Sequence, residues 1–143
     1  YVTGVQTCAL PICKTIGIWG LSFKPETDDI REAPSLYITD ALAKEGVQMK
    51  AYDPEAIETF KVASDEKTLK NMTFESDRDS VLDGVDALII CTEWNEFRRP
   101  DFENFKNRMN EPVIFDGRNL YSLERAEEAG LTYYSVGRRP VTR

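Results

Sequence analysis

Residues 17–34 read GIWGLSFKPETDDIREAP, and this stretch decides the fold. Its pattern predicts the end of a buried strand, a loop that carries Lys24 and Arg31, and the first turn of a helix. Pro34 suits the first helical position, whereas Ala33 before it has no side-chain oxygen with which to cap the free N–H groups. Two cations beside the positive end of a helix dipole favour an anion site in a chain whose net charge is -7. The alternative, that both cations only pair with acidic residues of the same loop, stays open.

Strands and helices alternate along the rest of the chain. Short apolar or alternating runs predict strands at residues 15–20, 47–52, 72–75, 87–91, 113–115 and 131–135. Capping residues, prolines and glycines predict helices at residues 34–45, from Pro54 after Asp53, at 76–84 with Ser76 as the cap, at 101–109 and at 122–130. The charged stretch 64–71 lacks apolar periodicity and is expected to be a solvated connection. This order predicts an α/β fold: a three-layer, doubly wound, mainly parallel sheet, Rossmann-like, in a single domain.

Composition narrows the class of protein. With 143 residues, 41% of them hydrophobic, the chain can bury one core of real size. Its negative net charge argues against a nucleic-acid-binding protein, and no apolar run is long enough to span a membrane. The chain has no histidine, which excludes Ser-His-Asp and Cys-His catalysis within it and most zinc sites, so no metal site is expected. Three cysteines and no secretory signal indicate a cytoplasmic protein without a disulfide framework.

Residues 1–13 differ sharply from the rest of the chain, since they hold none of its charged residues. The segment VTGVQTCALPI resembles the translation of a sequencing-library adapter fused to a truncated reading frame. We therefore expect residues 1–13 to be non-native and without fixed structure, and residues 14–143 to form the domain.

Several candidate ligand-binding residues follow predicted strands. Phe23 and Lys24 come after the first strand, residues 92–97 after the central one, and Arg118 after the next. Ligands of doubly wound sheets bind beyond the carboxyl ends of the strands, so these segments are expected to share a cleft. The guanidinium of Arg118 suits a phosphate or carboxylate, and its alternative role is an ion pair with Asp116.

Asp53 has two interpretations. It could bind the ribose of a dinucleotide, but Gly17 and Gly20 do not form the glycine pattern of a dinucleotide-binding loop, which needs close backbone approach to a pyrophosphate. A helix cap is the favoured role for Asp53.

Three further residues are interpreted as structural. Trp94 and Phe97 could stack on a base or sugar, but aromatic residues of loops more often pack on the edge of a core. Cys91 ends an apolar strand and has no base to activate it, so a buried thiol is expected rather than a nucleophile.

Five short motifs occur in a fixed order along the chain. They are GLSFKP at residues 20–25, TDDIREAP at 27–34, AYDP at 51–54, CTEWNEF at 91–97 and FDGRN at 115–119. In these motifs the chain resembles the C-terminal, UDP-sugar-binding domain of the UDP-glucose/GDP-mannose dehydrogenase family, most of all its UDP-glucose 6-dehydrogenases. The likeness extends from about residue 14 to 139.

The resemblance implies a function for a longer parent protein. Enzymes of this type oxidise C6 of UDP-glucose to give UDP-glucuronate, with two NAD, and are homodimers or higher homo-oligomers. Their NAD-binding domain and catalytic cysteine belong to other parts of the polypeptide, so this chain alone is expected to be inactive and to hold no catalytic residue.

The resemblance also assigns roles to individual residues. Phe23, Lys24 and Arg118 match positions that contact the UDP-sugar, and Arg31 matches an arginine that reaches NAD on the first domain. The alternatives are the corresponding domain of a UDP-N-acetylmannosamine or GDP-mannose dehydrogenase, or a stand-alone regulatory module of the receiver type. A receiver would need an acidic cluster directly after the first strand, where residues 20–24 offer no acid.

Overall fold

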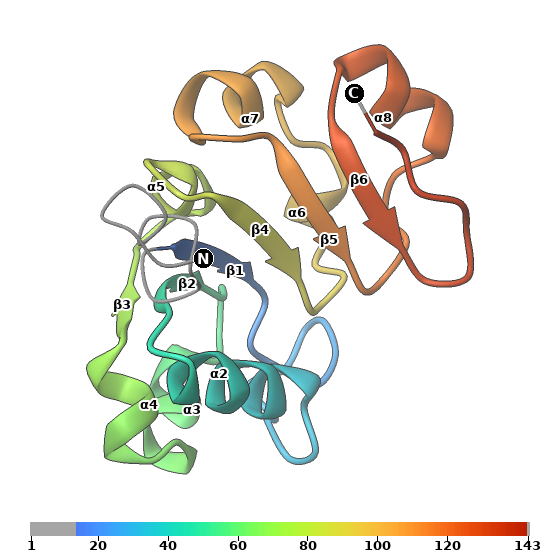
Figure 1. The fold of residues 1–143 in the computed structure, drawn as a ribbon. Helices are drawn as coiled ribbons and strands as arrows, with labels where there is room; N and C mark the ends of the chain where they lie inside the picture. The colour runs from blue at the N-terminus through green and yellow to red at the C-terminus, as the bar shows by residue number, and fades with distance from the viewer. Residues whose placement is uncertain (1–13, 143) are drawn as a thin grey trace, which may run out of the picture.

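A computed structural model describes residues 14–142 of the chain, which form one sheet between two layers of helices (Figure 1). The predicted non-native segment, residues 1–13, lies outside the described residues. The strands are β1 (Thr15–Trp19), β2 (Gln48–Tyr52), β3 (Met72–Phe74), β4 (Ala87–Ile90), β5 (Val113–Asp116) and β6 (Thr132–Ser135). They are arranged in the order β3-β2-β1-β4-β5-β6, and all neighbouring pairs are parallel. The prediction of a doubly wound, Rossmann-like α/β fold is confirmed.

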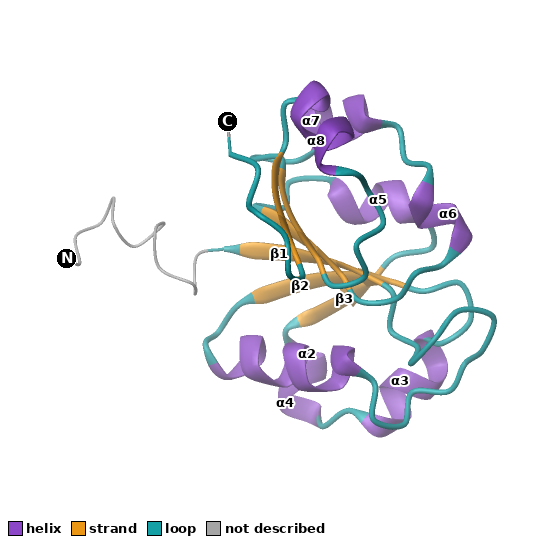
Figure 2. Ribbon diagram, turned by 90° about the vertical axis from the view of Figure 1, so that its right-hand side faces the viewer, coloured by secondary structure: helices purple, strands orange, loops and turns teal. Residues whose placement is uncertain are grey.

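The helices divide between the two faces of the sheet (Figure 2). One layer holds α2 (Pro34–Lys44), α3 (Ile57–Ala63) and α4 (Glu66–Lys70). The other layer holds α5 (Arg78–Leu82), α6 (Asn95–Arg98), α7 (Phe102–Arg108) and α8 (Leu123–Ala129). None of these described helices is both long enough and apolar enough to cross a bilayer.

Alternate residues of β1 enter the two halves of the core, as a strand buried on both faces requires. Trp19 packs on the side of α5 to α8, where its ring stacks on Phe97 with the centroids 4.9 Å apart. Ile18 packs on the opposite side with Leu21 and Phe60. Phe97 is fully buried and Trp94 nearly so, which confirms the prediction that both aromatic residues pack on the core.

Three predictions about helices were wrong: one helix was missed and two helix starts were misplaced. Residues 64–71 are not a plain solvated connection, because Asp65 accepts a hydrogen bond from the amide of Thr68 and starts α4 there. The cap of α5 is Asp77 rather than Ser76, since Asp77 accepts from the amide of Ser80. Helix α3 begins at Ile57, because the residues directly after Asp53 form a turn instead of the first helical turn.

Candidate functional site

The carboxyl ends of β1, β2, β4 and β5 meet at one edge of the sheet, and the loops that leave them form the candidate site. The parallel register sets Trp19 beside Tyr52 on one side and beside Ile90 on the other. Ile90 in turn pairs with Asp116. The loops after these strands hold the residues predicted to bind a ligand, so the predicted common edge is confirmed.

A buried carboxylate, that of Asp53, ties three of these loops together. Its Oδ2 accepts hydrogen bonds from the amides of Leu21 and Ser22, the Ser22 hydroxyl and the Trp94 indole, at 2.8, 3.0, 3.1 and 3.1 Å. Its Oδ1 accepts from the amides of Glu55 and Ala56, both at 2.8 Å, so Asp53 caps the turn before α3. The predicted helix cap is therefore wrong in position, because Asp53 caps the bend before α3 and not the helix itself, whose N-cap is Ala56. The same side chain also fixes the loop that leads to Phe23 and Lys24.

The crossing of Gly20 and Thr92 fixes the base of that loop. Gly20 has a φ of 93°, and a Cβ atom there would lie 2.7 Å from the amide nitrogen of Thr92. The Thr92 hydroxyl donates to the carbonyl oxygen of Ser22 at 2.6 Å. The backbones after β1 and β4 thus approach each other closely at a position where only glycine fits, so the packing of the fold itself accounts for Gly20.

Arg118 lies across the ends of two other strands. Its Nε donates to the carbonyl oxygen of Cys91 at 2.9 Å, and its Nη2 donates to that of Phe23 at 3.2 Å. The nearest carboxylate to its guanidinium is that of Glu93, 3.9 Å from Nη1. The side chain does not form the alternative ion pair with Asp116, which instead accepts from the backbone amide of Arg118 at 2.8 Å.

Asp116 holds the loop that carries Arg118. This buried carboxylate also accepts from the amide of Leu120 and from the hydroxyl of Tyr133, both at 2.6 Å. Burial, and then the hydrogen bond to Asp116, raise the pKa of Tyr133, so its hydroxyl stays protonated and donates. Sequence reasoning missed this supporting role, although the pairing of an acid with a following glycine and arginine is visible in residues 116–118.

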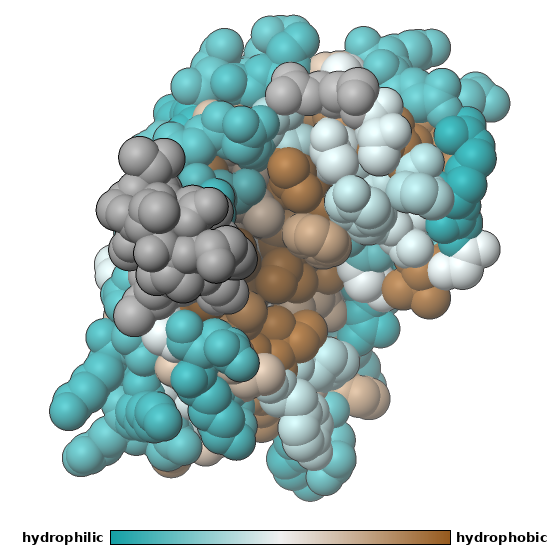
Figure 3. Space-filling view, viewed as in Figure 1, coloured by the Kyte–Doolittle hydropathy of each residue, from teal (hydrophilic) through white to brown (hydrophobic). Residues whose placement is uncertain are grey.

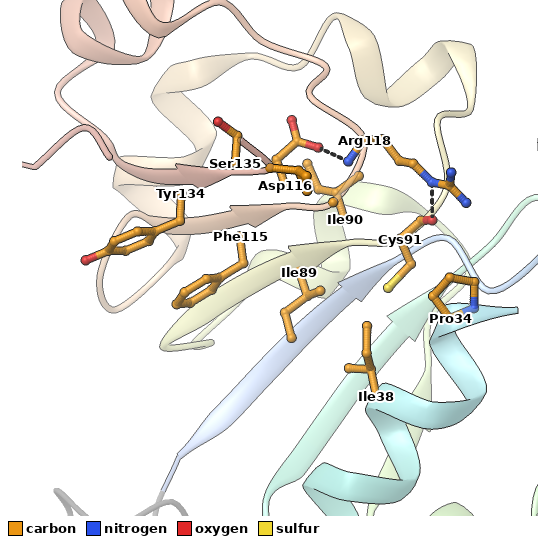
Figure 4. Close-up of a pocket in the computed structure, with 12 residues that line it drawn as sticks. Pro34, Ile38, Ile89, Ile90, Cys91, Phe115, Asp116, Arg118, Tyr134 and Ser135 are labelled. Atoms are coloured by element: carbon orange, nitrogen blue, oxygen red, sulfur yellow. Dashed lines mark hydrogen bonds between the residues drawn. The ribbon is translucent and has the colours of Figure 1, made fainter. Parts of the chain in front are cut away.

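A hollow of about 380 Å³ begins at Arg118 and extends along the sheet (Figure 4). Arg118, Cys91 and Pro34 lie at one end of it, and Phe115 and Tyr134 at the other. Pro34 is the first residue of α2, and Ala33 makes no side-chain cap, as the sequence predicted. The hollow therefore joins a guanidinium to a helix start whose amide groups have no side-chain acceptor, a combination that suits an anion.

Of the other predicted site residues, Phe23 and Lys24 belong to the loop beside Arg118, and Arg31 lies apart from it. Phe23 is adjacent to Arg118 through its carbonyl group, its ring is 44% exposed, and Lys24 follows it as an exposed residue. Arg31 lies elsewhere, in a second hollow beside α3. Its guanidinium donates two hydrogen bonds to Asp29, at 3.1 and 3.0 Å, and its backbone amide donates a third at 3.0 Å. The guanidinium bonds, and then the amide bond, hold the pKa of Asp29 at about 2. The structure thus contains the alternative that the sequence left open for Arg31, an ion pair with an acidic residue of the same loop.

Cys91 points into the hollow from the end of β4 (Figure 4). Its side chain is only 4% exposed, and burial raises the pKa of its thiol to about 12. A thiol with this pKa is not a nucleophile at neutral pH, which confirms the expectation of a structural cysteine.

A family profile and individual relatives of known identity match the chain and agree on one family. A family profile described as "UDP-glucose/GDP-mannose dehydrogenase family, UDP binding domain" matches residues 17–123. UDP-glucose 6-dehydrogenase of Pseudomonas aeruginosa is 41% identical over 126 residues, which are 87% of this chain and 28% of the relative. UDP-glucose 6-dehydrogenase YwqF of Bacillus subtilis is 43% identical over 128 residues, 90% of this chain and 28% of the relative.

A solved structure agrees with these relatives. The UDP-glucose dehydrogenase of the archaeon Pyrobaculum islandicum superposes with a TM-score of 0.66 at 29% identity, covering 85% of this chain and 24% of that one. The chain thus spans little more than a quarter of the length of the curated relatives it matches. The sequence resemblance, the sheet order and these matches agree: the chain belongs to the UDP-glucose/GDP-mannose dehydrogenase family and carries its UDP binding domain.

Proposed function

We propose that this chain holds the nucleotide sugar in a longer UDP-glucose 6-dehydrogenase, with the diphosphate at the Arg118 end of the hollow. The observation that carries the proposal is the position of Arg118, fixed to the carbonyl groups of Phe23 and Cys91 and facing the same hollow as the start of α2. Those two contacts use two of the five N–H groups of a guanidinium. Of the others, those on Nη1 lie near Glu93 at 3.9 Å, a separation longer than a hydrogen bond, so they can still bind phosphate oxygens. Lys24, exposed beside Phe23, adds a second cation within the same loop.

The chemistry of the chain suits binding rather than bond-making. It has no histidine, and its only cysteine in the described residues is buried with a raised thiol pKa. Its contribution is to hold the pyrophosphate and orient the sugar for groups supplied by the rest of the polypeptide. Oxidation of C6 of UDP-glucose to UDP-glucuronate with two NAD is the proposed reaction of the parent, in the cytoplasm, as a homodimer or higher homo-oligomer.

NAD belongs to another part of the parent in this proposal. The turn after β1, where a dinucleotide pyrophosphate would lie in a dinucleotide-binding domain, lacks the glycine pattern of such loops and carries Phe23 and Lys24. Arg31 fits an accessory role, because its side chain is 86% exposed and lines the hollow beside α3 rather than the Arg118 hollow. NAD, when bound, supplies the hydride acceptor, and Arg31 would offer a cation to its phosphates.

Calorimetric titration of the chain with UDP, UDP-glucose and GDP tests the proposal. We expect saturable binding of UDP and UDP-glucose, and a loss of about tenfold or more in affinity in the Lys24→Ala, Arg118→Ala double variant. Arg108→Ala is the matched control, since Arg108 pairs with Asp83 at a position outside the hollow. No heat with UDP, or equal affinity in the double variant, would contradict the assignment. Preferential binding of GDP would favour the GDP-mannose branch of the family.

A further inference from the structure

No helix within residues 14–142 covers one half of a sheet face. On the side of α2, α3 and α4, the described helices lie over β1, β2 and β3 but not over β5 and β6 (Figures 1 and 2). The contrast between the two faces of these strands is sharp. Ile114 and Tyr133 on the α8 side are fully buried, whereas Phe115 and Tyr134 on the other side are 43% and 38% exposed.

The uncovered surface is a continuous apolar row. Ile89, Phe115 and Tyr134 are neighbours in register on β4, β5 and β6. The rings of Phe115 and Tyr134 stack with their centroids 5.0 Å apart. Ile38 of α2 borders the row on one side, and Val136, 62% exposed, borders it on the other. We call these five residues the apolar groove, and Figure 3 shows hydrophobic residues gathered in the hollow beside α2.

Such a surface is unusual for a finished domain. All-parallel sheets are covered on both faces, because their strands are apolar on both sides. A contiguous exposed apolar patch marks a contact with another segment or molecule. Among the described residues that line the hollow, only Asp116 and Arg118 are charged, and both are bound to backbone groups. The apolar groove is therefore suited to an apolar partner.

We infer that the apolar groove is covered in the parent protein by an amphipathic helix supplied by the part of that polypeptide outside this chain. The matched relatives are long enough to contain such a helix elsewhere in the polypeptide, since this chain spans only 28% of their length. The remainder of the sheet indicates the kind of cover, because helices form the layers over its other surfaces. A helix laid beside α2 completes the second layer of the doubly wound fold.

A second copy of this chain is the poorer occupant. The groove is hollowed between α2 and the loop after β6, so two identical grooves cannot fill one another (Figure 3). Each copy also carries a net charge of -7, which opposes close approach of two copies.

Hydroxyl-radical footprinting of native aromatic residues tests the inference. The full 143-residue chain is compared with a chimaera in which it replaces the matching segment of the Pseudomonas aeruginosa relative. In the free chain, Phe115 and Tyr134 should oxidise readily. In the chimaera their rates should fall to that of Tyr121, a core residue 1% exposed. Tyr37, 62% exposed on α2 and outside the groove, is the internal control and should oxidise at the same rate in both proteins.

Two results would overturn the inference. One is oxidation of Phe115 and Tyr134 in the chimaera as fast as in the free chain. The other is protection already present in the free chain together with a dimer in sedimentation, which would make a second copy the occupant.

A substitution gives an independent readout. Phe115→Ser should lower the melting temperature of the chimaera by about 5 °C or more beyond its effect on the free chain, because the 43% of Phe115 that is exposed in the free chain is covered only in the chimaera. An equal effect in both proteins would refute the inference. UDP binding is measured on the free chain, which lacks the covering helix, so failure of either proposal is visible without the other.

Discussion

The Nη2 of Arg118 donates to the carbonyl oxygen of Phe23 at 3.2 Å, across 95 positions of sequence. This contact joins the loop after β5 to the loop after β1, which are the two segments proposed to hold the diphosphate. Because the partner is a backbone oxygen, the position of Arg118 depends on the course of the loop rather than on the identity of the Phe23 side chain.

Arg118→Lys should separate charge from geometry. A lysine keeps the cation but cannot contact the carbonyl groups of Cys91 and Phe23 as a planar fork does. We expect the affinity for UDP to fall by about tenfold with little change in unfolding free energy, measured by calorimetric titration and urea denaturation. Arg98→Lys on α6, an exposed residue outside the hollow, should bind UDP like the unchanged chain. Equal affinity in Arg118→Lys would show that charge alone suffices.

Asp53→Asn should destabilise the fold. The carboxylate accepts six hydrogen bonds, and an amide in either orientation turns one acceptor atom into a donor that faces other donors. We expect a loss of about 3 kcal/mol in unfolding free energy, measured by urea denaturation. Asp65→Asn is the matched control, because asparagine caps an exposed helix start as well as aspartate does. Similar losses in both variants would contradict the network described around Asp53.

Gly20→Ala should be far more harmful than Gly84→Ala. Both glycines have positive φ values, 93° and 75°, so alanine is strained at either position. At Gly20 the new Cβ would also meet the side chain and amide of Thr92, whereas at Gly84 nothing lies within 4 Å. We expect losses of about 4 kcal/mol and about 1 kcal/mol respectively, measured by thermal or urea unfolding. Equal losses would mean that the crossing of β1 and β4 loops is not tight in solution.

Arg31→Ala should raise the pKa of Asp29 from about 2 toward its ordinary value of 3.8. The cause is loss of the hydrogen bonds from the guanidinium, which favour the ionised carboxylate. A depressed pKa in the folded state stabilises it above pH 3.8, and this contribution disappears as the pH falls through about 2. NMR titration of the carboxyl carbons measures the change.

Asp65 is the control for that titration. Its pKa is also lowered, but by the amide and side chain of Thr68, so it should not move in Arg31→Ala. An unchanged Asp29 would show that the ion pair does not persist in solution.

The strands could be predicted from the sequence because each is a local signal. The apolar run at Ala87–Ile90 and the glycine after Thr15–Trp19 each mark a strand without reference to the rest of the chain. Helix α4 was missed because its local signal is weak: it is short and charged, and only Thr68 within it is buried. Its start depends on one side-chain cap that the apolar periodicity does not reveal.

The site was predictable to the level of loops but not of contacts. That Phe23 and Arg118 belong to one edge follows from parallel topology. The partners of Asp53 do not follow, because Leu21 and Trp94 lie 32 and 41 positions away and no local pattern links them. The ion pair of Arg31 with Asp29 is local, yet nothing in the sequence decides between it and a phosphate. Binding by Phe23, Lys24, Arg31 and Arg118 stays a prediction for the titrations above.

The placement of β1 in the middle of the sheet has a consequence for how the domain is made. Its neighbour β4 comes much later in the chain, since Ile16 pairs with Ala87, 71 positions on. The loops after β1 and β4, which Arg118 contacts, come together at one edge of the sheet only once the chain has closed that long loop. Chains with such distant contacts fold slowly. A nucleotide that recognises this edge binds only finished molecules. It should therefore slow unfolding of the completed domain without hastening its first assembly.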